Sequence, residues 1–310
     1  MFKNLSTWQK GVYLAFLTAL ISGGANFFNK LSMSVVGKSA YQYTTLKNVV
    51  VALVLLLIVI SPKMLTKLRQ LTKKDWRNLI LIGIIGGSFP FLLFFKGLSM
   101  TSAVNASFVH KTLFIWVAII AVPFLKEKLS KLQMGALGLL LIGNFIFNGF
   151  KGFTFGYAET IILIATIMWA VENVIAKITL KNVDAIVLAW ARMFFGAVVL
   201  VGYLALSNQL TGIMTFNFSQ ISWVFLVSLF LLGYVITWYS ALKRAPTTVV
   251  TSILVLASPI TTFLNCAFIS HQLSSQKIWG FVIIIFAIIL FLKLRVKIKF
   301  QQGELRRDYV

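Results

Sequence analysis

Ten apolar stretches of roughly bilayer-spanning length fill most of this chain of 310 residues. They comprise residues 11–34, 40–60, 77–98, 102–125, 132–150, 155–178, 183–206, 220–242, 247–269 and 276–296. A helix crosses the hydrocarbon core of a membrane with about 20 predominantly apolar residues. The chain is only 12% charged, whereas ordinary soluble domains are roughly 25% charged. Because the connections are short, we predict an all-α integral membrane protein whose ten transmembrane helices pack as one bundle.

Lysine and arginine are distributed unevenly between the connections. Of the 29 such residues, 21 lie in or beside the N-terminal segment, the C-terminal tail and every second connection, and five lie in or beside the other connections. The remaining three, Lys47, Lys111 and Arg192, lie in the interior of spans. Cytoplasmic segments of membrane proteins are enriched in Lys and Arg. This predicts a multi-pass protein of the cytoplasmic membrane with both termini, including a basic and polar tail at 295–310, in the cytoplasm. It also explains the net charge of +22 without a nucleic-acid partner.

The two halves of the chain, residues 11–150 and 155–294, repeat one another. Residues 25–30 match residues 172–177 at an offset of 147, and Lys47 matches Arg192 at an offset of 145. Each half contains five spans, and five is odd, so the second half enters the membrane from the opposite side. We therefore predict two inverted five-helix repeats, an architecture on which alternating-access transport is built.

Four short patterns carry a resemblance to a known family. They are the Lys47/Arg192 pair, residues 94–98 followed by 101–103, residues 124–130, and residues 257–260. In this order, on ten spans, the chain resembles the EamA-type permeases of the drug/metabolite transporter superfamily. The resemblance implies a small-solute permease with a central cavity lined mainly by spans 1, 3, 4, 6, 8 and 9. His271 stands where the second half would repeat Glu127, and Ile115 where the first half could carry the proline seen at Pro259, so the halves are functionally unequal.

His110 and Lys111 lie side by side near the middle of the fourth span. A charge at that depth costs at least ~2.5–3.5 kcal/mol, and lysine cannot reach a headgroup from there. We interpret Lys111 as a contact for an anionic substrate; a salt bridge or a bond to an amide or carbonyl group is the alternative. His110 is a second substrate contact or a packed interhelical residue. The matching positions in the second half, Leu254 and Val255, are apolar, which favours function over folding.

Two Asn/Lys pairs recur at i,i+4 spacing, Asn26/Lys30 and Asn173/Lys177, so each pair shares one helix face. The asparagines lie nearer mid-depth and are candidate substrate contacts, with interhelical hydrogen bonding as the alternative. The lysines lie towards opposite membrane faces. They are candidate gating residues, unless they simply extend to the headgroups.

Glu172 is the one carboxylate well inside a span, and we interpret it as a proton-coupling group; a structural ion pair with a nearby cation is the alternative. Glu159 and Asp184 lie near helix ends, where we expect them to be solvated. Lys47 and Arg192 recur in both halves, which favours a structural role over a second pair of substrate charges.

Aromatic residues and prolines complete the candidate site. Spans expected to line the cavity carry Trp169, Trp238, Tyr239, Phe91 and Phe94, which serve either recognition or packing. Pro90 and Pro259 interrupt the third and ninth spans at mid-depth and are candidate hinges.

Together these features predict a secondary transporter that moves a small anionic or zwitterionic metabolite by alternating access, with protons as a possible coupling ion. Candidate substrates are amino acids, carboxylates and phosphorylated compounds. The alternatives are an exporter of amphipathic drugs or toxic metabolites, a membrane-embedded sensor or enzyme using His110 and Glu172, and a channel. We expect no enzymatic activity, cofactor or metal, because phosphate loops, nucleophile elbows and metal-spaced His/Cys clusters are missing from the sequence. The expected partners are the solute and the lipid bilayer, for a monomer or homodimer.

Overall fold

The computed structural model describes residues 5–101, 103–148, 155–294 and 297–298, so most of the predicted tail at 295–310 lies outside the described residues. Ten helical segments are long and apolar enough to cross a membrane, which confirms the predicted all-α membrane fold. The first half contains α1 (Thr7–Val36), α2 (Ala40–Val59), α3 (Pro62–Arg69), α4 (Lys73–Gly87), α5 (Phe89–Leu98), α6 (Ala103–Lys111), α7 (Leu113–Leu125) and α8 (Lys131–Asn148).

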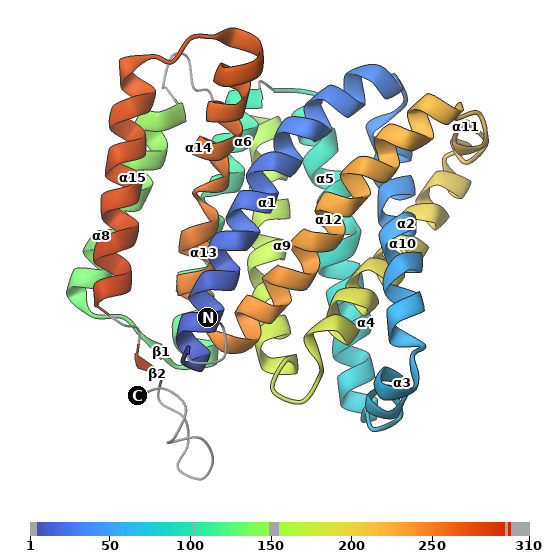
Figure 1. Ribbon diagram of the computed structural model, residues 1–310, viewed down its shortest axis with the longest axis horizontal. Coiled ribbons are helices and arrows are strands. Elements are labelled where there is room, and N and C mark those ends of the chain that lie inside the picture. Colours follow the sequence, from blue (N-terminus) through green and yellow to red (C-terminus); the bar gives the residue numbers. More distant parts are fainter. Residues whose placement is uncertain (1–4, 102, 149–154, 295–296, 299–310) are drawn as a thin grey trace.

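The second half repeats this order. It contains α9 (Tyr157–Thr179), α10 (Ala185–Leu206), α11 (Thr211–Met214), α12 (Phe218–Arg244), α13 (Thr247–Leu254), α14 (Ala257–Asn265) with a π-helical turn at Cys266–Ser270, and α15 (Ser275–Lys293). Two two-residue strands, β1 (Glu127–Lys128) and β2 (Lys297–Ile298), pair antiparallel. Figure 1 shows α1 beginning and α15 ending at the same end of the bundle, called the lower end below.

Three spans are each broken into two helices; we predicted interruptions in the third and the ninth, and the break in the fourth was not predicted. The third breaks at Ser88, the fourth at Thr112 and the ninth between α13 and α14. Pro90 is the second residue of α5 and Pro259 the third of α14, so each proline lies just after a break. The first turn of a helix tolerates proline because its N–H groups have no intrahelical partner. The fourth span has no proline at its break.

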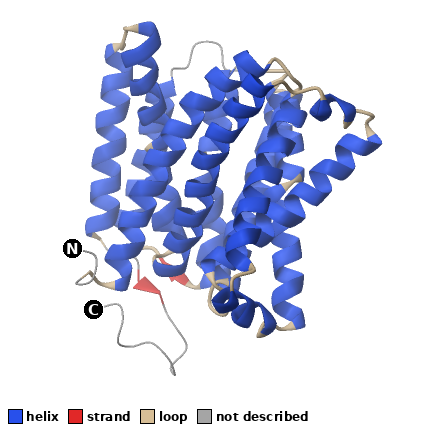
Figure 2. Ribbon diagram, turned by 45° about the vertical axis from the view of Figure 1, so that its right-hand side comes forward, coloured by secondary structure: helices blue, strands red, loops and turns tan. Residues whose placement is uncertain are grey.

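The helices pack as two interlocked repeats. The first helix of each repeat packs against the third span of the other, α1 against α12 and α9 against α4 and α5. Matching helices also pack in pairs, α2 with α10 and α8 with α15, and both pairs are visible in Figure 1. The N-caps of α2 and α10, Ser39 and Asp184, are 145 residues apart, and each accepts a hydrogen bond from the N–H two residues later. Figure 2 shows the resulting helix bundle from a second side.

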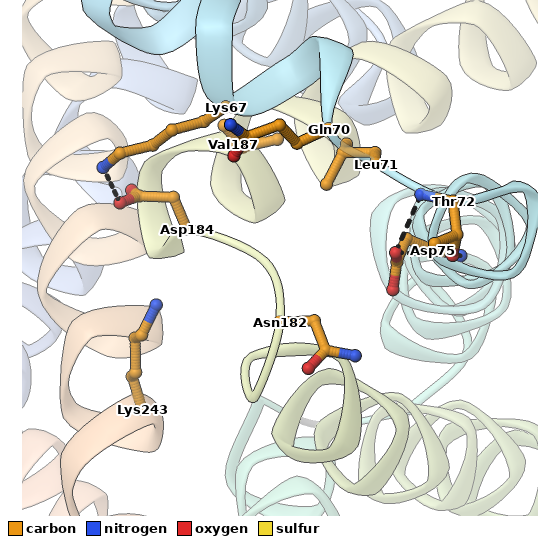
Figure 3. Close-up of a pocket in the computed structure, with 9 residues that line it drawn as sticks. All are labelled: Lys67, Gln70, Leu71, Thr72, Asp75, Asn182, Asp184, Val187 and Lys243. Atoms are coloured by element: carbon orange, nitrogen blue, oxygen red, sulfur yellow. Dashed lines mark hydrogen bonds and ion pairs between the residues drawn. The ribbon is translucent and has the colours of Figure 1, made fainter.

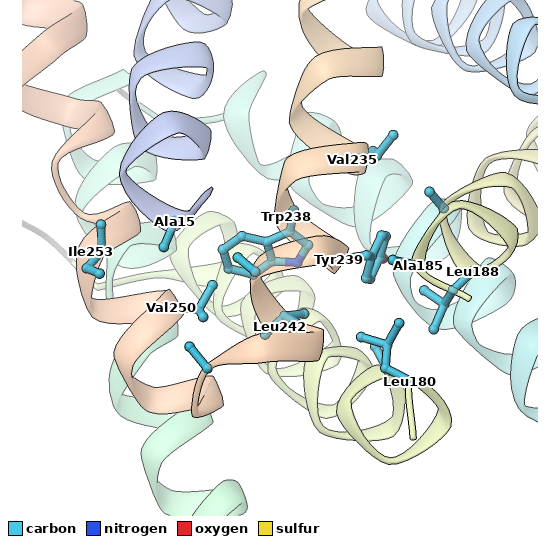
Figure 4. Close-up of a cluster of buried hydrophobic side chains, with 14 of the residues drawn as sticks. Ala15, Leu180, Ala185, Leu188, Val235, Trp238, Tyr239, Leu242, Val250 and Ile253 are labelled. Carbon is cyan, nitrogen blue, oxygen red and sulfur yellow. The ribbon is translucent and has the colours of Figure 1, made fainter. Parts of the chain in front are cut away.

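An apolar core seals the lower half of the bundle. Figure 4 shows Ala15 of α1 beside Val250 and Ile253 of α13. Leu242 of α12 follows towards the right of the view, and Leu180, just after α9, lies further right near Leu188. Each of these side chains is at most 2% exposed. The core therefore joins α1, α9, α12 and α13, which come from both repeats.

Candidate functional site

Lys111 is the last residue of α6, and the break at Thr112 separates it from α7. The Thr112 hydroxyl donates to the Val109 carbonyl oxygen at 2.6 Å and accepts from the Trp116 indole N–H at 3.1 Å. A cation in the last turn of a helix is favourable because the terminal carbonyls carry partial negative charge. The Lys111 side chain is half-buried and forms no ion pair or hydrogen bond among the described residues. All three N–H donors of its ammonium are therefore unpaired within the described part of the chain.

His110 packs into an aromatic cluster formed by α5, α6 and α9. The centroid of its ring lies 4.8 Å from that of Trp169 and 5.3 Å from that of Phe94. Phe91 also meets Trp169, at 5.3 Å. The Nδ1 atom of His110 is buried and has no hydrogen-bond partner in the described part of the chain. The structure thus brings the predicted residues His110 and Trp169 together, and leaves the Nδ1 atom of His110 without a hydrogen-bond partner among the described residues.

Glu172 lies in a buried polar cluster at Gly86 of α4. Its side chain is 2% exposed, and Oε1 accepts the Tyr239 hydroxyl at 2.6 Å. The Gly86 carbonyl oxygen accepts from Arg192 Nη2 at 3.1 Å and from the Trp169 indole N–H at 3.0 Å. A Cβ added at Gly86 would lie 2.4 Å from Glu172 Cγ and 3.3 Å from Arg192 Nε, so both side chains flank this glycine. Their charged groups are nevertheless more than 4.0 Å apart, too far for an ion pair.

Asn173, the neighbour of Glu172, connects α9 to α12. Its Oδ1 accepts the Trp238 indole N–H at 3.0 Å, and both side chains are buried. Trp238 also stacks on Tyr234, with centroids 5.8 Å apart and an angle of 11° between the ring planes. The amide oxygen of Asn173 thus fixes the indole of Trp238, as the packing alternative for this asparagine requires.

Asn26 and Lys30 lie on the same face of α1 as Ala15 and Ala19, because a helix turns by about 100° per residue. The two alanines are each 1% exposed in the sealed lower half. Asn26 and Lys30, further along the helix, are both exposed. On one face of α1 the side chains are therefore buried near the lower end and exposed towards the upper end.

Lys177 holds the end of α12 near the lower end of the bundle. Its ammonium donates to the carbonyl oxygens of Leu242 at 2.5 Å and Ala245 at 2.8 Å. Carbonyl groups at a helix C-terminus have no intrahelical partner, and a lysine satisfies them. Gly11 of α1 presses against the same turn, where an added Cβ would lie 2.7 Å from that of Ala245. Lys177 therefore bonds to protein and does not extend to the headgroups.

Glu127 bonds to the beginning of α13, directly after the turn that connects α12 to α13. Its carboxylate accepts the backbone N–H groups of Thr247 at 2.6 Å and Thr248 at 3.2 Å, and the Thr248 hydroxyl at 2.7 Å. The side chain is 1% exposed. The sequence alone did not indicate a site role for Glu127. His271, which replaces it in the second repeat, is exposed.

Glu159 is buried, which corrects the prediction that it is solvated. Its carboxylate accepts the N–H of Gly156 at 2.9 Å and the hydroxyl of Thr101. The first N–H groups of α9 need acceptors from outside the helix, and a glutamate in the first turn supplies one. Glu159 is therefore buried because it caps the beginning of α9, a role that the prediction of a solvated side chain did not consider.

Lys47 is nearly buried between α1 and α2, with 9% of its surface exposed. Its ammonium donates to Asn29 Oδ1 at 3.1 Å, and the same oxygen accepts the Tyr43 hydroxyl at 2.8 Å. Asn29 was not among the predicted site residues. It could have been found as a polar residue inside a span, directly before Lys30. Lys47 and Arg192 both bond to neutral protein atoms, the Asn29 amide oxygen and the Gly86 carbonyl oxygen.

A cavity of about 380 Å³ opens at the lower end between α3, α4, α10 and the end of α12. Figure 3 shows Lys67 and Asp184 paired at its rim, with 2.5 Å between Nζ and Oδ2. Burial raises the pKa of Asp184, but hydrogen bonds from Lys67 and from the Ile186 N–H outweigh it, so the pKa is below its usual value. None of the predicted site residues lines this cavity.

A second cavity of about 270 Å³ has a mainly apolar lining from α6, α7, α8, α9 and Phe155. Among the residues that the structure describes, no group of three or more His, Cys, Asp or Glu side chains could hold a metal ion.

Comparisons with known proteins agree with the fold and the repeat. The family model described as EamA-like transporter family matches residues 9–149 and again residues 156–293. A protein described as uncharacterized transporter sll1164, from Synechocystis sp., is 26% identical over 158 residues, which are 48% of this chain and 45% of that protein. A crystal structure described only as that of a protein superposes with a TM-score of 0.72 at 16% identity, covering 93% of this chain and 98% of the other. The chain belongs to the EamA-like transporter family and is a multi-pass membrane protein.

Proposed function

We propose that this chain is a secondary transporter for small anionic or zwitterionic metabolites, such as amino acids, carboxylates or phosphorylated compounds. Three cations in the interior of spans, Lys47, Lys111 and Arg192, support this substrate class. The ion pair recorded among the described residues is Lys67–Asp184, which lies at a loop and a short helix outside the spans. None of the three interior cations therefore forms an ion pair with a carboxylate of the described residues.

Unneutralised charge within a membrane is costly, at ~2.5–3.5 kcal/mol or more for each group. Glu172 can balance one of the three cations, so a net positive charge remains in the bundle. An anionic substrate would balance it during transport, and Lys111 is the cation with all its donors available. Asn26 is the amide contact of this proposal, with His110 and the aromatic side chains around it as the walls.

Alternating access is supported by the difference between the two ends of the bundle. Glu127, Lys177 and the apolar core hold the lower end closed, whereas Asn26 and Lys30 are exposed on the upper half of α1. In our proposal the lower end faces the cytoplasm, as the distribution of Lys and Arg predicts. Labelling a Thr211→Cys variant tests this orientation, because reaction from the cytoplasmic side alone would overturn it.

Glu172 is the proposed proton-coupling group. A carboxylate buried beside a tyrosine hydroxyl and close to a guanidinium can exchange a proton as the neighbouring charge changes. Uptake into proteoliposomes should respond to a pH gradient in the wild type and lose that response in Glu172→Gln. If uptake ignores the gradient in both proteins, coupling through Glu172 is wrong.

A thermal-shift screen across amino acids, organic acids and nucleotides is the first test of the substrate class, since a ligand of the folded state raises the melting temperature. Uptake of a hit by Lys111→Gln should fall at least tenfold. Lys96→Gln, which removes an exposed cation at the end of α5, is the matched control and should transport normally. Anion uptake by Lys111→Gln at the wild-type rate would refute the substrate contact.

The apolar cavity beside α6 and α7 favours a second candidate function, export of amphipathic compounds that enter from the membrane. Uptake of amphipathic cations that is indifferent to Lys111→Gln would favour this function over the first.

A further inference from the structure

The recurring cation has different neighbours in the two repeats. Lys47 of α2 matches Arg192 of α10 at an offset of 145, the offset that also relates the N-caps Ser39 and Asp184. In the second repeat, the preceding helix supplies a carboxylate close to the cation, from Glu172. The matching residue of the first repeat, 147 positions earlier, is Ala25.

Lys47 therefore lacks the acid that its counterpart has nearby. Glu172 and Arg192 flank the same glycine, Gly86. Lys47 instead has neutral neighbours, a hydrogen bond to Asn29 and the ring of Tyr43, whose centroid is 5.3 Å from Nζ. Its ammonium has three N–H donors, and one hydrogen bond is recorded for it within the described residues.

The place of the missing acid is defined by α1. Asn29 donates from Nδ2 to the Ala25 carbonyl oxygen at 2.7 Å and accepts Lys47 with its Oδ1, so Ala25 lies one helical turn below the residue that holds the ammonium. Ala25 is half-buried, while its neighbour Asn26 is exposed. The side chain of glutamate exceeds that of alanine by one CH₂–COO⁻ unit, which is the size of acetate.

We propose that Lys47, Asn29 and Tyr43 form a binding site for a small carboxylate, which takes the place beside Ala25 that the Glu172 carboxylate has in the second repeat. The site rests on the proposed anion transport, because the carboxylate would be that of the transported solute. Exposed Asn26 and Lys30 on the adjacent face of α1 provide the approach from the upper end. The bound carboxylate neutralises Lys47, so the two repeats become electrically equivalent only when solute is present.

The test uses the purified full-length protein in detergent and acetate as the probe. Sodium acetate should raise the melting temperature by about 2–4 °C at ten times its Kd, relative to sodium chloride at equal ionic strength. Lys47→Met should abolish this shift and Lys47→Arg should retain it. Ala25→Glu should also abolish it, because the tethered carboxylate occupies the site, and should raise the melting temperature without acetate. Ala25→Gln fills the same space without charge, so it should lose the shift and gain no stability.

Several outcomes would overturn the site: no shift in the wild type, or an undiminished shift in Lys47→Met or Ala25→Glu. Failure of the site is distinguishable from failure of the proposed function. Anion uptake without an acetate shift refutes the site and leaves the transport function. An acetate shift that depends on Lys47, in a protein that transports no anion, refutes the function and leaves the site.

Discussion

Replacing Glu127 with glutamine should open the lower end of the bundle. The carboxylate accepts two backbone N–H groups and one hydroxyl at the beginning of α13 while it is 1% exposed. Glutamine keeps one acceptor oxygen and turns the other into a donor that faces an N–H group. Losing one charge-assisted hydrogen bond costs ~1.5–3 kcal/mol, and losing the charge at a helix N-terminus adds ~0.3–1 kcal/mol. A net loss of about 2–3 kcal/mol would raise the ratio of open to closed molecules roughly 30- to 150-fold.

Maleimide labelling of an Ala19→Cys variant in a Cys266→Ser background measures this change. Ala19 is 1% exposed on the face of α1 that the lower end covers, so its labelling rate reports the open population. Adding Glu127→Gln should increase the rate by the factor above. Lys128→Gln, which removes an exposed charge from the same strand, is the control and should leave the rate unchanged. A lower melting temperature with unchanged labelling in Glu127→Gln would refute the role of Glu127 in keeping the lower end closed. Glu127 would then only stabilise the folded protein.

Three further changes test the surrounding structure. Lys177→Met leaves carbonyl oxygens at the end of α12 without a donor, at a cost of ~1–3 kcal/mol, and should also accelerate Ala19→Cys labelling. An unchanged labelling rate would show that Lys177 does not help to keep the lower end closed. In Gly86→Ala the new methyl group would lie 2.4 Å from Glu172 Cγ. This overpacking costs ~1–3 kcal/mol, so the melting temperature should fall and pH-dependent uptake should be lost. Uptake with the wild-type pH dependence would contradict this prediction. Asp184→Asn keeps an N-cap on α10 but removes a carboxylate whose pKa is lowered on folding, so its stabilisation is complete above about pH 4 and disappears as the pH falls through the folded value. The deficit in melting temperature of Asp184→Asn at pH 7 should therefore shrink towards pH 3, and an equal deficit at both pH values would exclude the charge as its cause.

The sequence was sufficient for the architecture because membrane spans impose a length and composition that few soluble helices share. All ten spans were predicted, and the recurrence of Lys47 as Arg192 revealed the repeat. The breaks within spans were harder to predict. Pro90 and Pro259 marked two of them, since proline cannot continue a helix from the preceding turn. At the break at Thr112 the threonine hydroxyl donates to the Val109 carbonyl oxygen, but threonine does the same in many unbroken helices, so this residue could not mark the break in advance.

The partners of the charged residues were the least predictable part of the site. Spacing along one helix indicates which face a residue occupies, but partners come from helices distant in the sequence. Glu127 contacts Thr247 across 120 residues, and Arg192 contacts Gly86 across 106. Comparing the repeats recovers part of this information, because a symmetric scaffold predicts equal partners at matching positions. The repeats depart from that symmetry at Lys111, at Ala25 and at His271, and at these positions the shared fold does not account for the residue type. In our proposal, Lys111 and Ala25 mark places where the substrate binds. His271 replaces Glu127, which bonds to α13 at the closed end of the bundle.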